Sequence, residues 1–277
     1  MKNLIIIFSL LIIITNANAQ KTYKRHIISL NGTWQIAEGK KDIVPKSFHH
    51  TIQVPGLVSL ASPSFINAGP KLKNRDSLFQ YDTLREAFWY RRIFMVLGSI
   101  PAVAILKISN AMFGTKVFLN GKDLGEHLPC FTPGFFNVKD VLKTGENELI
   151  VRIGSSRNSV PLSIPNGFDF ETERYIPGIY DNVELILSGT PHIINVQAVP
   201  DITSKQLRVQ LNISNSGEAT NSKIGFTIRE ARSKKIVIRK MLAKITAINP
   251  VSLLPVLFIV TRYICRVYNF YFPPVFE

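Results

Sequence analysis

Asp169 and Glu171 are two acidic residues separated by one position in the segment Asn166 to Glu171. Side chains of an extended segment alternate between two faces, so these two carboxylates would share one face. Ionised carboxylates act only as hydrogen-bond acceptors, so acceptance of hydrogen bonds is the chemistry open to this pair. The alternative interpretation is a solvated loop whose acids lie near Arg174.

The other reactive side chains form no catalytic or metal-binding pattern. Cys130 and Cys265 lie far apart in the sequence and match no metal-ligand or redox spacing, so neither a disulfide framework nor a zinc ribbon is predicted. No Gly-x-Ser-x-Gly phrase accompanies the five histidines, which leaves a serine hydrolase without support. We predict no catalytic residue, no metal and no cofactor.

The net charge of +14 would suit an anionic partner, such as nucleic acid, a membrane surface or an acidic polysaccharide. The charges are nevertheless dispersed along the chain. The longest basic cluster, Arg229 to Lys240, is interrupted by an acid and by apolar residues. We interpret it as a solvated strand face rather than a nucleic-acid patch, and predict no nucleic-acid partner.

The N-terminus has the pattern of an export signal. Lys2 precedes an apolar run from Leu4 to Ile14, and Ala17-Asn18-Ala19 supplies the small residues that a signal peptidase reads. A run of about 11 residues is well short of the roughly 20 that cross a bilayer, which disfavours the alternative of a permanent membrane anchor. We therefore predict a cleaved signal peptide at residues 1–19 and a secreted or periplasmic protein.

The elements that must position any site are predicted to be β-strands. From Leu30 to Leu187, short β-branched and aromatic segments alternate with Gly, Pro, Asn and Asp, and no sustained helical period occurs. Asn120-Gly121 between two such segments predicts a hairpin with a type I′ turn. The fold class is therefore all-β, with a β-sandwich at 24–190. Its predicted buried residues are Trp34, Trp89, Val117, Leu119, Leu149 and Val151.

The tryptophans and arginines of this region have mainly structural interpretations. Trp34 is predicted to be a core anchor, with a sugar-stacking platform as the alternative. In Trp89-Tyr90-Arg91-Arg92 the side chains alternate, so Trp89 and Arg91 should face one way and the other two the opposite way. The arginines are expected to pack over aromatic rings or to pair with carboxylates, and a clamp for a substrate carboxylate is the alternative.

The rest of the chain changes character twice. Residues 191–245 offer four strands between polar turns, and an immunoglobulin-like sandwich needs about seven, so an incomplete domain of that type is predicted. Residues 246–277 are atypical in composition and contain four prolines. We interpret this last segment as a non-native tail, such as a frameshift would produce, in preference to a membrane anchor.

Seven phrases, in order, resemble the N-terminal region of glycoside hydrolase family 2, which includes β-galactosidases, β-glucuronidases and β-mannosidases. Over about 160 residues their order is specific, although each phrase alone is weak. They are Leu30-Asn31-Gly32-Thr33-Trp34, Val54-Pro55-Gly56, Phe88-Trp89-Tyr90-Arg91-Arg92-Ile93-Phe94, Val117 to His127, Phe131-Thr132-Pro133, Gly145 to Val151 and Pro177 to Leu185.

The resemblance implies a jelly-roll sugar-binding domain, then an immunoglobulin-like domain, then a (β/α)8 barrel that carries two catalytic glutamates. Retaining enzymes of this kind need the two carboxyl groups about 5 Å apart. The residues after position 190 are far fewer than the roughly 250 of such a barrel. The expectation is therefore a chain that lacks the catalytic barrel.

In some members of the family, an acidic side chain in the region of Asp169 and Glu171 accepts hydrogen bonds from sugar hydroxyls, which gives these two residues an expected substrate-binding role. The predicted function is the non-catalytic carbohydrate-binding part of a secreted family 2 glycoside hydrolase, present as a fragment, with a β-glycoside as ligand. The alternative is a self-standing secreted carbohydrate-binding module. The sugar itself is not identified by the sequence.

Overall fold

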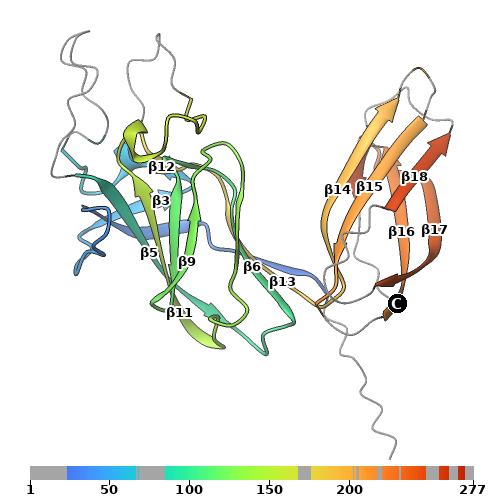
Figure 1. Cartoon of the computed structure of the whole chain (residues 1–277), viewed down its shortest axis with the longest axis horizontal. Helices are drawn as coiled ribbons and strands as arrows, with labels where there is room; N and C mark the ends of the chain where they lie inside the picture. The colour runs from blue at the N-terminus through green and yellow to red at the C-terminus, as the bar shows by residue number, and fades with distance from the viewer. Residues whose placement is uncertain are drawn as a thin grey trace, which may run out of the picture.

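The computed structural model describes residues 24–66, 68, 85–167, 176–201, 203, 206–216, 220–230, 232–247, 256–261 and 268–271. The regular structure within these ranges is almost entirely β, which confirms the all-β prediction. Figure 1 shows two β units, β1–β13 and β14–β19, which we call the first and second units. In the described part of the chain, no helix is long and apolar enough to span a membrane.

The strands of the first unit are β1 His26–Ser29, β2 Gly32–Gly39, β3 His50–Val54, β4 Gly56–Leu57, β5 Ala87–Val96, β6 Val103–Ile108, β7 Ala111–Met112, β8 Thr115–Leu119, β9 Lys122–His127, β10 Gly134–Asn137, β11 Gly145–Gly154, β12 Gly178–Ile179 and β13 Val183–Ser188. The strands of the second unit are β14 His192–Asp201, β15 Gln206–Ser214, β16 Thr220–Glu230, β17 Ile236–Ala247, β18 Val256–Thr261 and β19 Tyr268–Tyr271.

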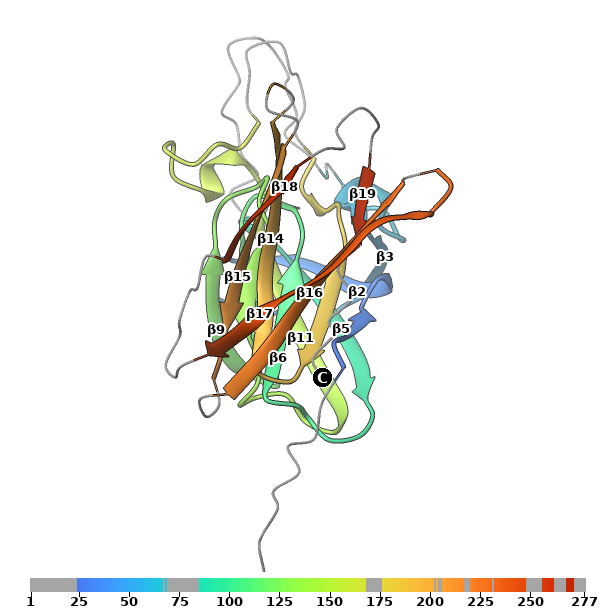
Figure 2. The ribbon, with the colours of Figure 1, turned by 90° about the vertical axis from the view of Figure 1, so that its right-hand side faces the viewer.

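The first unit is a β-sandwich. A six-stranded antiparallel sheet, in the order β3-β2-β5-β11-β8-β9, and a four-stranded sheet, β1-β13-β6-β10, enclose the main core (Figures 1 and 2). Burial of this apolar surface is the main force that holds the two sheets together. The six residues that the sequence predicted to be buried are all at most 2% exposed, so that prediction is confirmed: Trp34, Trp89, Val117, Leu119, Leu149 and Val151.

Strand β5 alternates as predicted. Tyr90 lies in the main core, where its ring meets that of Trp34 edge-on at 6.3 Å between centroids. Arg91 lies on the opposite face, where its Nε donates to Glu148 Oε1 at 2.5 Å and its guanidinium lies 5.8 Å from the centre of the Phe48 ring. Trp34 is thus a core anchor, and Arg91 both pairs with a carboxylate and packs over an aromatic ring.

The β8–β9 hairpin has the predicted turn. Asn120 and Gly121 have positive φ angles of 51° and 82°, which a type I′ turn requires at both central positions. The Asn120 side chain donates to Asn147 Oδ1 at 2.9 Å and to Val141 O at 2.8 Å. This turn is therefore held against the loop that precedes β11.

Several of the seven phrases meet in space. Asn31 donates through Nδ2 to Asn182 Oδ1 at 2.7 Å and accepts through Oδ1 from the Val183 amide at 3.0 Å. Strands β4 and β12 pair so closely that a side chain at Gly178 would meet Gly56 O at 2.5 Å. The phrases at the two ends of the first unit therefore close the sandwich.

The second unit consists of two three-stranded sheets, β14-β15-β18 and β17-β16-β19, around a small core of Leu207, Val209, Phe226 and Ile228. The segment predicted to be an atypical tail contributes one strand to each of these sheets. Strands β18 and β19 lie within residues 246–277 and pair with β15 and β16. The β-branched and apolar composition of Val256–Thr261 suits such a strand, although the prolines around it concealed the pattern. The non-native origin of the segment stays a prediction.

Candidate functional site

Asp169 and Glu171, the predicted site residues, lie outside the residues that the structure describes, as does Arg174. The structure does describe the residues that flank them in the sequence, Gly167 and Ile176. Gly167, with φ of +77°, lies so close to the Phe131 ring that a side chain there would meet Cζ at 2.8 Å, and Ile176 packs against the main core. The acidic segment is therefore bounded at both ends by the first unit.

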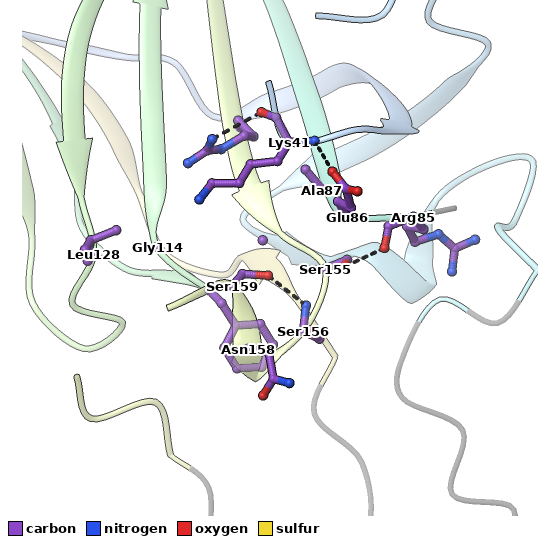
Figure 3. Close-up of a pocket in the computed structure, with 13 residues that line it drawn as sticks. Lys41, Arg85, Glu86, Ala87, Gly114, Leu128, Ser155, Ser156, Asn158 and Ser159 are labelled. Carbon is purple, nitrogen blue, oxygen red and sulfur yellow. Dashed lines mark hydrogen bonds between the residues drawn. The ribbon is translucent and has the colours of Figure 1, made fainter. Parts of the chain in front are cut away.

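The first unit contains a pocket of about 410 Å³, which is within the 300–1,000 Å³ typical of ligand sites (Figure 3). It lies where β5 begins and β11 ends, beside the turn between β7 and β8. A side chain at Gly167 would meet Met112 Cε of β7 at 3.8 Å, and the residue after Met112, Phe113, lines the pocket. The lining residues are Lys41, Arg85, Glu86, Ala87, Phe113, Gly114, Leu128, Arg152, Gly154, Ser155, Ser156, Asn158 and Ser159.

One wall of the pocket is the short 3-10 helix η3, Arg157–Ser159. A capping box joins Ser156 and Ser159, and the Ser156 amide donates to Ser159 Oγ at 3.4 Å. Gly154 permits this tight turn, because a side chain there would collide with Ser159. The Ser155 hydroxyl donates to Arg85 O at 2.9 Å, so the end of β11 is tied to the start of β5.

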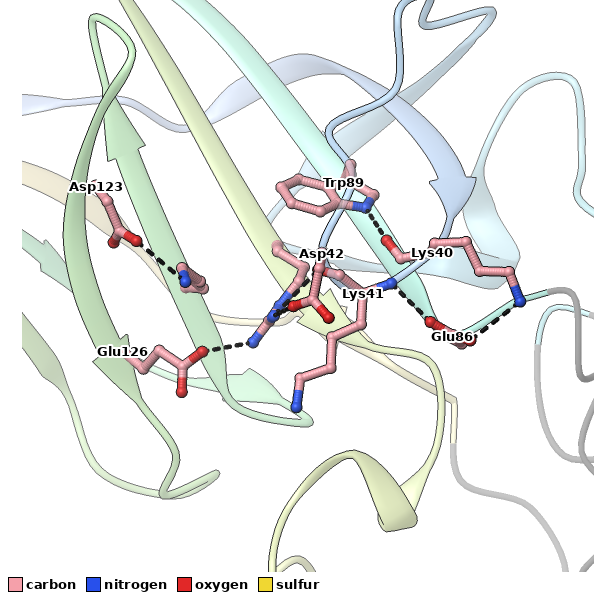
Figure 4. A network of polar contacts seen from close by, with 9 residues as sticks. Lys40, Lys41, Asp42, Glu86, Trp89, Asp123 and Glu126 are labelled. Atoms are coloured by element: carbon pink, nitrogen blue, oxygen red, sulfur yellow. Dashed lines mark hydrogen bonds and ion pairs between the residues drawn. The ribbon is translucent and has the colours of Figure 1, made fainter.

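The charged wall is a network of paired groups (Figure 4). Arg152, whose side chain is only 8% exposed, donates through Nη2 to Glu126 Oε1 at 2.9 Å and through Nη1 to Lys41 O at 3.2 Å. Asp42 lies 4.0 Å from the same guanidinium. Arg152 therefore has its charge compensated within the protein and acts as a structural support for the pocket.

Glu86 holds the loop after β2 in place. Its carboxylate accepts from the Lys41 amide at 2.9 Å and from Lys40 Nζ at 3.0 Å (Figure 4). The Lys41 amide, followed by the Lys40 side chain, lowers the pKa of Glu86 below its usual value. Trp89 Nε1 donates to Lys40 O at 3.0 Å, so the loop also covers the indole.

Two lining groups retain their hydrogen-bonding capacity. The Lys41 ammonium and the Asn158 amide, both exposed, form no hydrogen bond or ion pair within the described ranges. An ammonium donates, and an amide both donates and accepts, which suits a ligand with several hydroxyl groups. In the part of the chain that the structure describes, no cluster of three or more His, Cys, Asp or Glu residues could hold a metal ion.

The sequence analysis missed this pocket. The signal that could have found it is the run Ser155-Ser156-Arg157-Asn158-Ser159, which is polar and directly follows a buried strand. Beneath the pocket, Phe113, Cys130 and Val160 form a small apolar cluster. Burial raises the pKa of the Cys130 thiol, so it is a packing residue rather than a nucleophile.

This chain is similar to part of several known glycosidases. It is 27% identical over 151 residues to the β-galactosidase of Thermoanaerobacter pseudethanolicus, a match that covers 53% of this chain and 20% of that protein. No protein-family model matches the chain.

Two solved structures are similar in fold. The β-D-mannosidase of Dictyoglomus thermophilum aligns over 85% of this chain and 31% of its own, with a TM-score of 0.63 and 22% identity. The Bacteroides uniformis β-glucuronidase 2, solved covalently bound to cyclophellitol-6-carboxylate aziridine, aligns over 86% of this chain and 28% of its own, with a TM-score of 0.59 and 19% identity. The chain thus spans less than a third of these relatives. The resemblance to family 2 glycoside hydrolases that the seven phrases indicate is confirmed.

Proposed function

We propose that this chain, which resembles family 2 glycoside hydrolases in fold and in part of its sequence, is the non-catalytic carbohydrate-binding part of such an enzyme. The observation that carries the proposal is the polar pocket of the first unit, which leaves the Lys41 ammonium and the Asn158 amide available to a ligand. Its volume and mixed lining suit one sugar residue of a β-glycoside. Asp169 and Glu171 would add acceptors for sugar hydroxyls.

The proposal also covers location and catalysis. The predicted signal peptide at residues 1–19 would send the protein to the periplasm or the exterior. We expect no hydrolysis by the chain itself, because the family mechanism needs two carboxyl groups held about 5 Å apart on a (β/α)8 barrel. The described residues form β-sheets and short 3-10 segments instead.

Direct binding measurements test the proposal. The chain without residues 1–19 is titrated with the methyl β-glycosides of galactose, glucuronic acid and mannose, and binding is followed by calorimetry and by saturation-transfer NMR. We expect at least one sugar to bind with a dissociation constant of about 1 mM, or about −4 kcal/mol, as befits one small site. p-Nitrophenyl β-glycosides, assayed in parallel, should show no turnover above the buffer background.

Variants locate the binding site. Asn158→Ala should weaken binding about threefold to tenfold through the loss of one or two hydrogen bonds. Asp169→Asn with Glu171→Gln should weaken it about tenfold, since hydrogen bonds to charged groups contribute more. Asp140→Asn, an exposed change distant in sequence from both segments, is the matched control and should bind as the parent. Absence of binding to all three sugars would refute the proposed function.

A different observation distinguishes a self-standing carbohydrate-binding module from the front part of a hydrolase. Translation of the genomic DNA downstream of the Glu277 codon in all three frames would reveal a barrel sequence if the chain is the front part of a hydrolase. A barrel in another frame would support the proposal, whereas unrelated sequence in every frame would favour the module.

A further inference from the structure

The longest basic cluster of the sequence, Arg229 to Lys240, forms the end of the β16–β17 hairpin in the second unit. It contains six Lys or Arg residues and one acid, Glu230. Figure 2 shows the end of this hairpin, in orange, extending past strand β19 at the right of the view. The cluster is thus at the tip of a protruding element, in a different unit from the polar pocket.

Local hydrogen bonds fix the shape of the tip. The Glu230 amide donates to Lys235 O at 2.9 Å, and the Lys234 amide donates to Glu230 O at 2.9 Å. Lys234 has a positive φ of 58°, and Arg229 Nη1 donates to Lys234 O at 3.2 Å. Arg232, Lys234 and Lys235 are all exposed on this ordered turn.

The strands below the tip add two arginines to the same charged region. Phe226 and Ile228 are buried in the core of the second unit, so Thr227 and Arg229 lie on the other face of β16, where Thr227 is buried and Arg229 is half-buried. Arg239 lies directly opposite Thr227 in the ladder, on the same face of the sheet, and is exposed. A register shift pairs Arg229 with Ile236 beside the tip, so both arginines belong to the part of the hairpin nearest the tip.

The positive charge of this region has little compensation within the protein. Within the described ranges, no ion pair is formed by Arg229, Arg232, Lys234, Lys235 or Arg239. The carboxylate of Glu230 accepts from the Ser233 hydroxyl at 2.5 Å. Cations held this close repel one another, and a polyanion that bound them would remove the repulsion.

We propose that the tip and outer face of the β16–β17 hairpin bind a linear anionic polysaccharide that carries carboxylate or sulfate groups. Arginine suits such a ligand because its planar guanidinium can donate two parallel hydrogen bonds to a carboxylate or sulfate. The exposed lysines contribute further charge along the hairpin. This site is independent of the polar pocket and would hold the protein on an acidic glycan.

A polysaccharide fits the hairpin better than a single-stranded nucleic acid does. Proteins that bind single-stranded nucleic acid place aromatic side chains among the cations to stack the bases. The tip from Arg229 to Arg239 contains no aromatic residue. A two-stranded ribbon such as this hairpin can enter the major groove of a duplex, so duplex DNA is the competing ligand in the test below.

Two triple variants of equal charge test the proposal. The first carries Arg232→Gln, Lys234→Gln and Lys235→Gln at the tip. The control carries Lys46→Gln, Lys122→Gln and Lys143→Gln, three exposed positions of the first unit that form no ion pair in the described structure. The chain without residues 1–19 and both variants are applied to immobilised heparin, alginate and neutral dextran, and affinities at 50 mM NaCl are measured by calorimetry.

We expect the parent and the control to bind heparin or alginate, and the tip variant to bind at least about tenfold more weakly, with no retention on dextran. Equal weakening of both variants would show a net-charge effect and overturn the proposal. Binding of duplex DNA more tightly than either polysaccharide would also overturn it. Circular dichroism checks the fold of the variants, and protection of Lys234 and Lys235, but not Lys46, from acylation by bound alginate provides a test on the unaltered chain.

Discussion

Asn147 connects two loops of the first unit, and its replacement should destabilise that unit strongly. The side chain is 1% exposed and makes four hydrogen bonds. Oδ1 accepts from the Lys143 amide at 2.9 Å and from Asn120 Nδ2 at 2.9 Å. Nδ2 donates to Lys143 O at 2.7 Å and to Gly145 O at 3.0 Å.

Asn147→Ala removes all four bonds. A typical hydrogen bond contributes about 0.5–1.5 kcal/mol, and a buried group left without a partner costs about 1–3 kcal/mol. Lys143 is exposed, Gly145 is half-buried and Asn120 still donates to Val141 O, so water and the remaining bond compensate part of the loss. We expect a loss of about 2–3 kcal/mol in the free energy of unfolding.

Asn147→Asp separates hydrogen bonding from size. The carboxylate still accepts from Lys143 and Asn120, but its second oxygen then faces the two carbonyl groups. A protonated carboxyl could donate to one of them, which raises the folded-state pKa of the new acid. Its stability deficit should therefore shrink as the pH falls through that raised pKa, whereas the deficit of Asn147→Ala should not.

Tryptophan fluorescence during urea unfolding is the assay, because the chain has two tryptophans and both are buried in the first unit. With a denaturant slope of about 2–3 kcal/mol/M, a loss of 2–3 kcal/mol lowers the midpoint by about 1 M. Asn195→Ala, at an exposed position of the second unit, is the control and should leave the midpoint unchanged. A midpoint for Asn147→Ala that matches the parent would refute the reasoning.

Two further changes test the packing of the strands and the junction between the units. Gly178→Ala should lower the free energy of unfolding by about 1–3 kcal/mol, because the new methyl group would meet Gly56 O at 2.5 Å and Leu57 Cα at 2.8 Å. The thermal midpoint of this variant should therefore fall. The midpoint of the control, Gly39→Ala, should not fall, because the nearest contact of its new methyl group is at 3.5 Å. Burial, together with the charge of Arg25, lowers the pKa of His192 below 6.5, so the unfolded chain binds a proton more readily and stability should fall as the pH drops below 6.5. The drop in thermal midpoint between pH 7.5 and pH 5.5 should be smaller for His192→Gln than for the parent, and it should be unchanged for the exposed His49→Gln. An equal drop in the parent and both variants would contradict this prediction.

The fold of the first unit could be predicted because its local signals agree with one another. Alternation placed Leu149 and Val151 in the core, and Asn120-Gly121 fixed a turn that the structure confirms. The fold of the second unit was harder to predict from the sequence, because the strand from Val256 to Thr261 pairs with β15, which is far away in sequence. Prolines near such a strand weaken the local signal, and the partner that stabilises it is not visible in the sequence.

The candidate site could be predicted only in part. The pocket combines residues near positions 41, 86, 113, 128 and 155, which no rule of sequence spacing connects. The hydrogen bond from the Lys41 amide to Glu86 brings the first two of these segments together. Arg152 illustrates the same limit. It lies on the outward side of β11 in the sequence pattern, yet it is nearly buried because the loop around Lys41 covers it.

The seven phrases that carry the resemblance have mainly structural contacts, and this explains why they do not identify the sugar. Asn31 binds Asn182, and Gly56 pairs with Ile179, so these phrases specify how the sandwich closes. The pocket wall at Ser155–Ser159 and the acidic segment at 168–175 lie between two of the phrases, Gly145 to Val151 and Pro177 to Leu185. Asn158, an exposed pocket residue of that interval, makes none of the contacts that close the sheets. Ligand specificity in this unit should therefore be governed by such exposed positions between the phrases, and Asn158→Ala should alter sugar binding while the unfolding midpoint stays constant.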